Sequence, residues 1–173
     1  MSEGFEKGPQ DLVQEFHEVF DPDSVATQPG WPDLEQARMR VRLMLEELDE
    51  VALEFEQVYG GLQNPADGLA AVGKELADLL YVVYGTGVTL GLPLDGLLAA
   101  VHANNMTKLW STDEMNAAQS GDGVHRFVNA GDGKWVAYRE DGKVLKPPSY
   151  EKLEFAIGAI VIEHAQQEGG ADD

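Results

Sequence analysis

The spacing of apolar positions along the chain predicts a mainly helical protein. Over most of the sequence, apolar residues recur three or four positions apart, which is the repeat of one helix face. Prolines, glycines and acidic residues mark where these segments begin and end, so most loops between them are short. The predicted helices cover residues 11–20, 32–59, 67–91, 93–110 and 150–167.

A different pattern follows in the C-terminal third. Residues 120–133 are rich in Gly, Asp and Asn and predict an extended surface loop, whereas residues 134–146 alternate as a small hairpin does. Helices joined by short loops are typical of an antiparallel bundle. We therefore expect one all-α domain over residues 1–173, an antiparallel bundle of about four main helices. Its core is expected at 33–117, followed by a small C-terminal hairpin or loop appendage at 118–173.

Composition narrows the class of function. The formal net charge of -19 argues against binding to a nucleic-acid backbone, and it suits a phosphate substrate only where cations reverse the local charge. The absence of cysteine excludes disulfides, thiolate metal sites and cysteine nucleophiles. Residues 1–10 lack the apolar stretch of a signal peptide, and glycines and Asp78 interrupt the longest apolar run. We therefore expect no membrane span and a cytoplasmic protein.

The helix predicted at 32–59 gathers acidic side chains beside its apolar face. At about 100° per residue, six apolar side chains share one stripe, which we expect to face the core. They are Leu48, Val51, Ala52, Phe55, Val58 and Tyr59. Four acids adjoin that stripe, although like charges one turn apart repel each other. They are Glu46, Glu47, Glu50 and Glu54. A solvated acidic face has the same pattern, so this helix alone leaves its function open.

Two acids of the next helix are harder to explain as solvated surface. Glu75 and Asp78 lie one turn apart in a run of Leu, Val and Tyr. A carboxylate buried in such a place costs several kcal/mol unless it is paired. Lys74 could pair with Asp78 four positions on, but that pairing leaves Glu75 unexplained. We therefore expect both carboxylates to belong to a site.

Antiparallel packing of these two helices can bring the acid pairs face to face. Donor sets made only of oxygen favour a hard cation, Mg²⁺ or Mn²⁺, over zinc, and such ions commonly share a phosphate substrate with the protein. A carboxylate-bridged di-iron bundle is discounted, because none of the four histidines follows a Glu by three positions. The pattern predicts a cation site that neutralises phosphate charge and activates water.

The two acid pairs resemble the E-x-x-E and E-x-x-D motifs of the MazG-like all-α NTP pyrophosphohydrolases, a superfamily that includes dimeric dUTPase-like enzymes. Here the motifs read Glu47-Leu-Asp-Glu50 and Glu75-Leu-Ala-Asp78. Downstream, the segment from His102 to Lys108 is similar to the H-x-x-N-M-x-K segment of that superfamily. The resemblance covers about residues 35–110 and extends more loosely beyond them.

The resemblance implies a reaction and its carboxylates. A (deoxy)nucleoside triphosphate would be hydrolysed to the monophosphate and pyrophosphate by attack of water on the α-phosphorus, and we favour dUTP as the substrate. The metal ligands would be Glu47, Glu50, Glu75 and Asp78, with Mg²⁺ as the cofactor and Mn²⁺ as a possible substitute. Glu46 and Glu47 would be the catalytic carboxylates, with Glu46 orienting or deprotonating the water or binding a further metal ion.

The resemblance also implies substrate contacts downstream of the acids. Asn105 and Lys108 match positions that contact the nucleotide, and a lysine suits a phosphate as a point charge. A later segment resembles a C-terminal tail of this branch, through which Lys143, Lys146 and Tyr150 could close over the triphosphate. Lysines on an ordinary surface hairpin have the same pattern.

Several questions stay open on the sequence. Residues 118–133 match nothing in the family pattern, and Trp31 and Trp110 are candidates for the base pocket, the core or an interface. The apolar faces predicted at 67–91 and 93–110 are broad, which favours a homodimer. A house-cleaning dNTP pyrophosphatase of broad specificity is one alternative. A non-enzymatic acidic helical module that mimics nucleic acid is another, but it needs acids that are fully exposed.

Overall fold

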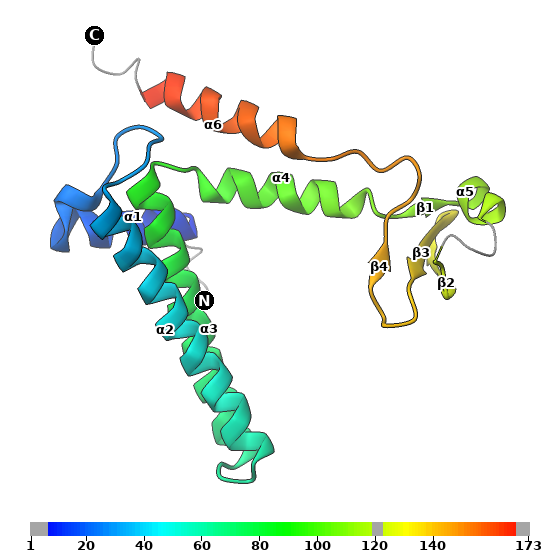
Figure 1. Cartoon of the computed structure of the whole chain (residues 1–173), viewed down its shortest axis with the longest axis horizontal. Coiled ribbons are helices and arrows are strands. Elements are labelled where there is room, and N and C mark those ends of the chain that lie inside the picture. The colour runs from blue at the N-terminus through cyan, green and yellow to red at the C-terminus, as the bar shows by residue number, and fades with distance from the viewer. Residues whose placement is uncertain (1–6, 119–122, 169–173) are drawn as a thin grey trace, which may run out of the picture. The chain divides into compact units, whose positions relative to one another are not determined.

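The computed structural model describes residues 7–118 and 123–168. Over these residues the protein is 63% helical, with six α-helices and one four-stranded antiparallel sheet (Figure 1). The expectation of an all-α fold is therefore corrected to a mostly helical fold with a small sheet. The chain forms two compact units, residues 1–95 with 160–173 and residues 96–159. The expectation of one domain over the whole chain stays a prediction.

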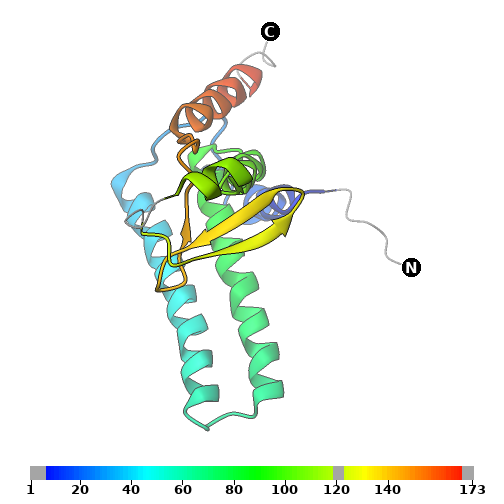
Figure 2. The ribbon, with the colours of Figure 1, turned by 90° about the vertical axis from the view of Figure 1, so that its right-hand side faces the viewer.

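Three helices build the first unit. α1 spans Pro9–Phe20, a short 3₁₀ turn η1 spans Pro22–Ser24, α2 spans Leu34–Tyr59 and α3 spans Pro65–Leu90. α2 and α3 lie side by side as an antiparallel hairpin, and α1 packs against α3 (Figures 1 and 2). The helices predicted for this part of the chain are confirmed.

Polar residues and glycine set the ends of these helices. Asp33 caps α2 by accepting a hydrogen bond at 2.8 Å from the backbone amide three residues on. Asn64 caps α3, and Pro65 takes its first position, two residues before the predicted start. Gly91 ends α3 with a φ of 62°, where an added Cβ would lie 2.5 Å from the Gln28 carbonyl oxygen. The hairpin is therefore bounded by local chemistry.

The apolar core of this unit is small. Its buried members are Val13, Val51, Val72, Tyr84 and Val88. The stripe of α2 that was expected to face the core contributes only Val51, because Leu48 and Phe55 are half-exposed and Tyr59 is largely exposed. That expectation is wrong for a single chain: α3 is the helix that packs along α2, whereas α1 reaches α2 at Arg40, so much of so wide a stripe stays uncovered.

The remaining elements include the sheet. They are α4 (Leu94–Met106), β1 (Trp110–Ser111), α5 (Thr112–Ala117), β2 (Arg126–Gly131), β3 (Lys134–Tyr138), β4 (Val144–Leu145) and α6 (Glu154–Glu168). β3 is the central strand, with β2 along one edge and β1 and β4 sharing the other. Ala137 pairs with Leu145, which confirms the hairpin predicted over residues 134–146.

Trp110 closes the small core of the second unit. Its ring is buried and meets Phe127 edge-on, with ring centroids 5.4 Å apart, and its indole N–H donates to the Leu145 carbonyl at 3.1 Å. Ala137 lies fully buried in the same sheet. Trp110 is therefore a packing residue of this unit rather than an exposed stacking surface.

α4 ends at Met106 rather than at the predicted residue 110, because Trp110 pairs with β3 as part of β1, and residues 112–117 form the unpredicted helix α5. Two further elements differ from the prediction. Residues 126–131 form β2 rather than loop, because pairing with β3 satisfies their backbone groups although Gly and Asn mask the strand pattern. α6 begins at Glu154, later than expected, because hydrogen bonds hold Tyr150 and Glu151 outside the helix. The expected loop at 119–122 and the expected frayed end at 169–173 lie outside the described residues.

No single helix among residues 7–118 and 123–168 is long and apolar enough to cross a membrane, and only α3 and α4 taken together meet that test.

Candidate functional site

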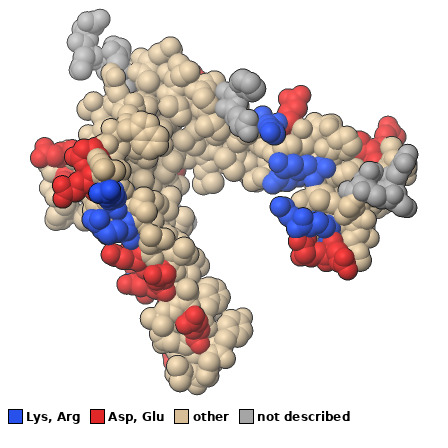
Figure 3. Space-filling model, viewed as in Figure 1, with Lys and Arg blue, Asp and Glu red and all other residues tan. Residues whose placement is uncertain are grey.

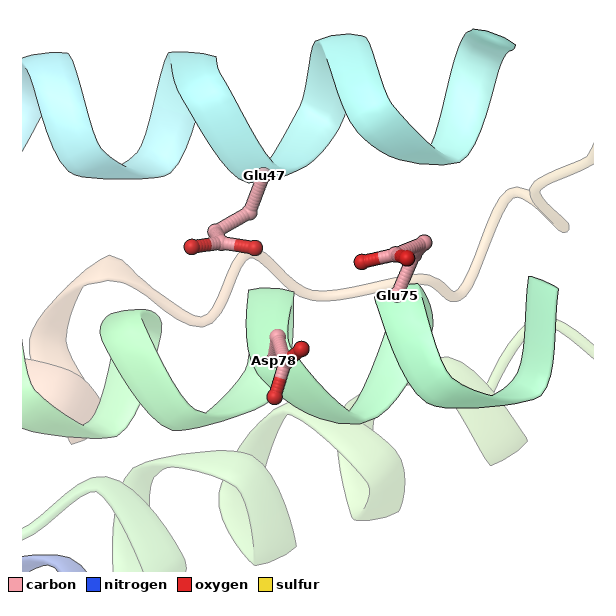
Figure 4. A group of neighbouring side chains, drawn as sticks. All are labelled: Glu47, Glu75 and Asp78. Atoms are coloured by element: carbon pink, nitrogen blue, oxygen red, sulfur yellow. The ribbon is translucent and has the colours of Figure 1, made fainter. Parts of the chain in front are cut away.

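The facing edges of α2 and α3 bring three carboxylates together (Figure 4). Glu47 comes from α2, while Glu75 and Asp78 come from successive turns of α3. One oxygen of each carboxylate lies within 4.8 Å of the others, and no second group of this kind occurs in the described part of the chain. We call Glu47, Glu75 and Asp78 the carboxylate cluster. The acid pairs of the two helices therefore meet across the hairpin, as antiparallel packing predicts.

The cluster lies at the surface of the hairpin rather than deep inside it. The side chain of Glu75 is 12% exposed and that of Asp78 is 42% exposed. Leu76 and Leu80, their neighbours on α3, are also exposed in this chain. The apolar run of α3 is thus covered mainly in its second half, around Tyr84 to Thr89, and Glu75 alone matches the expected burial.

Lys74 already supplies one cation to these acids. Its ammonium Nζ lies 2.8 Å from Asp78 Oδ2, 2.9 Å from Glu75 Oε2 and 4.0 Å from Glu50 Oε2. Hydrogen bonds to Asp78 and then to Glu75 raise the pKa of Lys74, so it stays protonated. The pairing with Asp78 that the sequence allowed is therefore present, and the same ammonium also serves Glu75.

Two further acids of α2, Glu50 and Glu46, differ in how they relate to the carboxylate cluster: Glu50 interacts with Glu75, and Glu46 does not belong to the cluster. A side-chain hydrogen bond to Glu75 and the charge of that carboxylate raise the pKa of Glu50, with smaller contributions from burial and from Glu47. Two carboxylates so close together repel each other, and a nearby cation stabilises their charged forms. Glu46 is exposed and lies outside the carboxylate cluster.

The predicted substrate-binding residues all belong to the second unit, where they form pairs. The Lys108 ammonium donates to Asn105 Oδ1 at 2.6 Å. The Lys146 ammonium lies 4.2 Å from the centre of the Tyr150 ring, as in a cation–π pair. Lys143 is exposed in the turn between β3 and β4.

Two residues that the sequence reading did not single out hold this region in place. Asn104 accepts a hydrogen bond from the Tyr150 hydroxyl and donates to the Glu151 carbonyl at 3.0 Å. Glu114 accepts from the backbone amides of Ser111 and Ser149, and hydrogen bonds from Ser149 and then Ser111 lower its pKa to about 2. A capping-box pattern at Ser111 could have signalled Glu114, but nothing local signals Asn104.

Trp31 lines a separate hollow of the first unit. Its side chain is 91% exposed, and it borders a cavity of about 370 Å³ together with Gln28, Gln36 and Thr89. An exposed aromatic ring beside amide and hydroxyl groups can stack on a planar ring and bond its edge. Trp31 thus keeps the role of base-pocket candidate.

A buried polar group that the sequence did not predict joins α1, α2 and η1. The His17 ring Nδ1 lies 2.8 Å from Ser24 Oγ and 3.1 Å from a guanidinium nitrogen of Arg40. Burial and the charge of Arg40 lower the pKa of His17. We call His17, Arg40 and Ser24 the buried histidine group. Arg40 follows His17 by 23 positions, and the three residues carry no motif.

The model of the protein family described as phosphoribosyl-ATP pyrophosphohydrolase matches residues 13–105. The chain belongs to this family. The family is part of the MazG-like all-α NTP pyrophosphohydrolase superfamily, which confirms the resemblance noted in the sequence. The match covers most of α1, all of α2 and α3 and nearly all of α4, and it contains the carboxylate cluster and Lys74. No curated protein matches the chain.

Family membership gives the cluster a chemical context. The family is one of nucleotide pyrophosphohydrolases, and such MazG-like enzymes typically depend on divalent metal ions. Three carboxylates on neighbouring turns supply the hard oxygen donors that such an ion takes. The Lys74 ammonium, held by two of them, is a stand-in cation at the same place. The donor set therefore fits a divalent cation.

Proposed function

We propose that the protein hydrolyses a nucleoside triphosphate, with dUTP as the first candidate, to the monophosphate and pyrophosphate in a reaction that requires Mg²⁺. The observation that carries the proposal is the carboxylate cluster between α2 and α3, inside the region that matches the family. The hairpin of two packed helices holds these acids on rigid elements, as a catalytic site requires.

Glu47, Glu50, Glu75 and Asp78 are the residues that would hold Mg²⁺, or Mn²⁺ in its place. The ion supplies positive charge to the phosphates and lowers the pKa of bound water. Glu75, nearly buried, is held by its surroundings and is the ligand best positioned in advance. Glu50 is included because the Lys74 ammonium, which pairs with Glu75 and Asp78, also lies 4.0 Å from Glu50 Oε2.

The reaction balances with one water molecule. The water oxygen forms a bond to the α-phosphorus, and the bond from that phosphorus to the oxygen bridging to the β-phosphate breaks. Pyrophosphate leaves with the electron pair, and a carboxylate accepts the proton of the water. Glu46 is our candidate for this base, because its carboxylate is exposed to water and is not one of the three that form the carboxylate cluster. Glu47 orients the attacking water beside it.

The substrate contacts are proposed from residues that offer donors and positive charge. Lys108 and Asn105 would bind phosphate and sugar, and Lys143, Lys146 and Tyr150 would contact the triphosphate. Their unit is nearly neutral overall, with seven basic and eight acidic residues over 96–159, whereas the whole chain carries -19. Figure 3 shows Lys and Arg side chains beside Asp and Glu on one face of this unit. A phosphate therefore meets less repulsion there than elsewhere on this acidic protein.

Substrate choice has two further candidates. Phosphoribosyl-ATP is favoured by the description of the matching family. A broad dNTP range is favoured by the openness of the hollow at Trp31, where one exposed ring could stack on any base. A mimic of nucleic acid fits less well, since Glu75 is nearly buried and the family is enzymatic.

We also propose that two chains form a homodimer through the open faces of α2 and α3. Large apolar side chains stay exposed along both helices, and monomeric proteins rarely leave so many together. They include Val41, Leu45, Leu48, Leu53, Phe55, Leu69, Leu76 and Leu80. A second copy of the same hairpin offers the matching apolar surface. Light scattering at micromolar concentration should give twice the chain mass, and a monomer there would contradict the dimer.

The experiment for the function is a substrate panel with pyrophosphate as the readout. Purified protein is incubated with the canonical dNTPs and NTPs, dUTP and phosphoribosyl-ATP, each with Mg²⁺, with Mn²⁺ and with EDTA. We expect pyrophosphate from at least one of these nucleotides in either metal and none in EDTA. Release from none of them would refute the proposed function, and release that persists in EDTA would refute the metal requirement.

A further inference from the structure

Lys74 occupies the place where a metal ion would have to bind. Its ammonium contacts Asp78 and Glu75 at 2.8 and 2.9 Å, and both carboxylates belong to the cluster. It also lies 4.0 Å from Glu50. A single positive charge is thus shared among several acids that would otherwise repel each other.

The ammonium and a divalent cation cannot hold these oxygens at the same time. A small divalent ion binds carboxylate oxygens at about 2.1 Å, so an ammonium on the same oxygens would stand only a few ångströms from it. Two cations that close repel each other strongly, even near a protein surface. Metal binding therefore requires Lys74 to leave Glu75 and Asp78.

The Lys74 ammonium can move away from Glu75 and Asp78 with only a small change in free energy. Its side chain is 63% exposed, and a lysine carries its charge on a flexible stem of four carbons. Exposed ion pairs contribute little net free energy, so water can replace the carboxylates around the ammonium. The backbone of Lys74, inside α3, does not have to move.

We propose that Lys74 is a tethered counterion that holds the metal-free cluster together, competes with the divalent cation for it, and so raises the metal concentration that the protein needs. The proposal rests on the proposed function in one respect, the assignment of the carboxylate cluster as the metal site. It assigns a role to Lys74, which is not one of the four expected metal ligands.

The test is Mn²⁺ binding to nucleotide-free protein, measured by titration calorimetry in the wild type and in variants. Lys74→Gln removes the competing charge and should tighten Mn²⁺ binding about three- to fivefold, near the upper end of what an exposed ion pair contributes. Lys74→Met, which keeps the apolar stem, should show the same gain. Lys74→Arg keeps a cation and should stay within about twofold of the wild type.

Lys7→Gln is the matched control. Lys7 pairs with Glu15 of α1 at 2.9 Å and is exposed to a similar degree, so its loss changes the net charge equally without touching the cluster. Its Mn²⁺ affinity should equal that of the wild type. An equal gain in Lys7→Gln would show a general charge effect and overturn the proposal.

The outcomes separate this inference from the proposed function. If the wild type binds Mn²⁺ and the neutral Lys74 variants bind it equally or more weakly, the counterion role is wrong and the proposed function stands. If neither the wild type nor the neutral Lys74 variants bind Mn²⁺, the cluster is not the metal site, and the inference and the metal assignment fail together. Thermal unfolding of each variant in EDTA confirms that binding is compared between folded proteins.

Discussion

The carboxylate cluster and the buried histidine group lie on the same helical unit but differ in the sign of their charge and in its exposure to solvent. The cluster collects acids around one exposed ammonium, that of Lys74. The buried histidine group places Arg40, 6% exposed, against His17, 5% exposed, and among the described residues no carboxylate forms an ion pair with Arg40. One group has an excess of negative charge at the surface, and the other encloses a cation.

The cation at the surface cluster can be replaced by another cation from solution, whereas the buried guanidinium of Arg40 cannot. A surface cluster can trade its cation with the solvent, because water solvates each state as it forms. A buried guanidinium has no such alternative, and burial lowers the pKa of Arg40 while it stays bonded to His17. We therefore expect changes in the cluster to alter catalysis and metal binding, and changes in the buried histidine group to alter stability.

The largest effect expected is the loss of a cluster carboxylate. Glu47→Gln and Asp78→Asn each replace a charged oxygen donor by a neutral amide, so turnover with the best nucleotide should fall by about two to three orders of magnitude. Thermal stability in EDTA should change little, because Glu47→Gln relieves acid repulsion and the ion pair that Asp78→Asn removes from Lys74 is exposed. Steady-state pyrophosphate release and thermal unfolding measure the two quantities.

Glu56→Gln is the control for those variants. Glu56 is an exposed acid of the same helix outside the cluster, so its loss should leave turnover unchanged. Near-native turnover in either cluster variant would break the assignment, and an equal loss in Glu56→Gln would reduce the effect to overall charge.

A smaller effect is expected from added bulk beside the buried histidine group. A Cβ on Gly85 would lie 2.8 Å from His17 Nε2 and 3.2 Å from Arg40 Nη1. Both atoms are buried and bonded, so Gly85→Ala should reduce the free energy of unfolding by about 1–2 kcal/mol. Urea denaturation measures the change.

Gly73→Ala is the matched change in the same helix. Nothing lies within 4 Å of a Cβ at Gly73, so alanine should raise stability by about 0.5–1 kcal/mol through its helix propensity. Equal effects of the two variants would mean that the space around Gly85 adapts and that the buried group is not tightly packed.

The smallest expected effect is a pH dependence of stability from His17. Its pKa is lowered in the folded protein, by burial first and then by Arg40, from an ordinary value of 6.5. The unfolded chain therefore takes up this proton at higher pH than the folded protein does. The contribution of His17 is complete above pH 6.5 and declines on acidification, by at most about 1.4 kcal/mol per pH unit.

His17→Gln should flatten this decline. Urea denaturation between pH 7.5 and about pH 5, run in EDTA, measures the slope in a window where a lowered histidine pKa acts. His102→Gln, at an exposed position of α4, should retain the slope of the wild type. A slope that persists in His17→Gln would place the titrating group elsewhere.

Parts of the site were readable from the sequence because they are local. The spacing of Glu47 and Glu50, and of Glu75 and Asp78, puts each pair one helical turn apart wherever the helices lie. The helix starts of α2 and α3 could be predicted to within a few residues from the capping residues Asp33 and Asn64. The roles assigned to these acids stay predictions until turnover and metal binding are measured.

Other features depended on how distant segments pack. Glu46 and Glu47 adjoin in the sequence, yet only Glu47 joins the cluster, because a helix turns neighbouring residues by about 100°. The expected core stripe of α2 stays largely uncovered in one chain, since periodicity predicts a face but not what covers it. The strand at 126–131 appears only through its pairing with β3.

The sequence by itself determined the three helices of the first unit and nearly all their ends, the two acid motifs and the family. Each depends on residues a few positions apart, whose preferences act before the chain folds. Tertiary structure alone decided that Glu47 meets Glu75 and Asp78, that Lys74 serves two acids, and that His17 meets Arg40. Those contacts depend on the rotation and packing of whole helices against each other, which no local pattern of residues specifies.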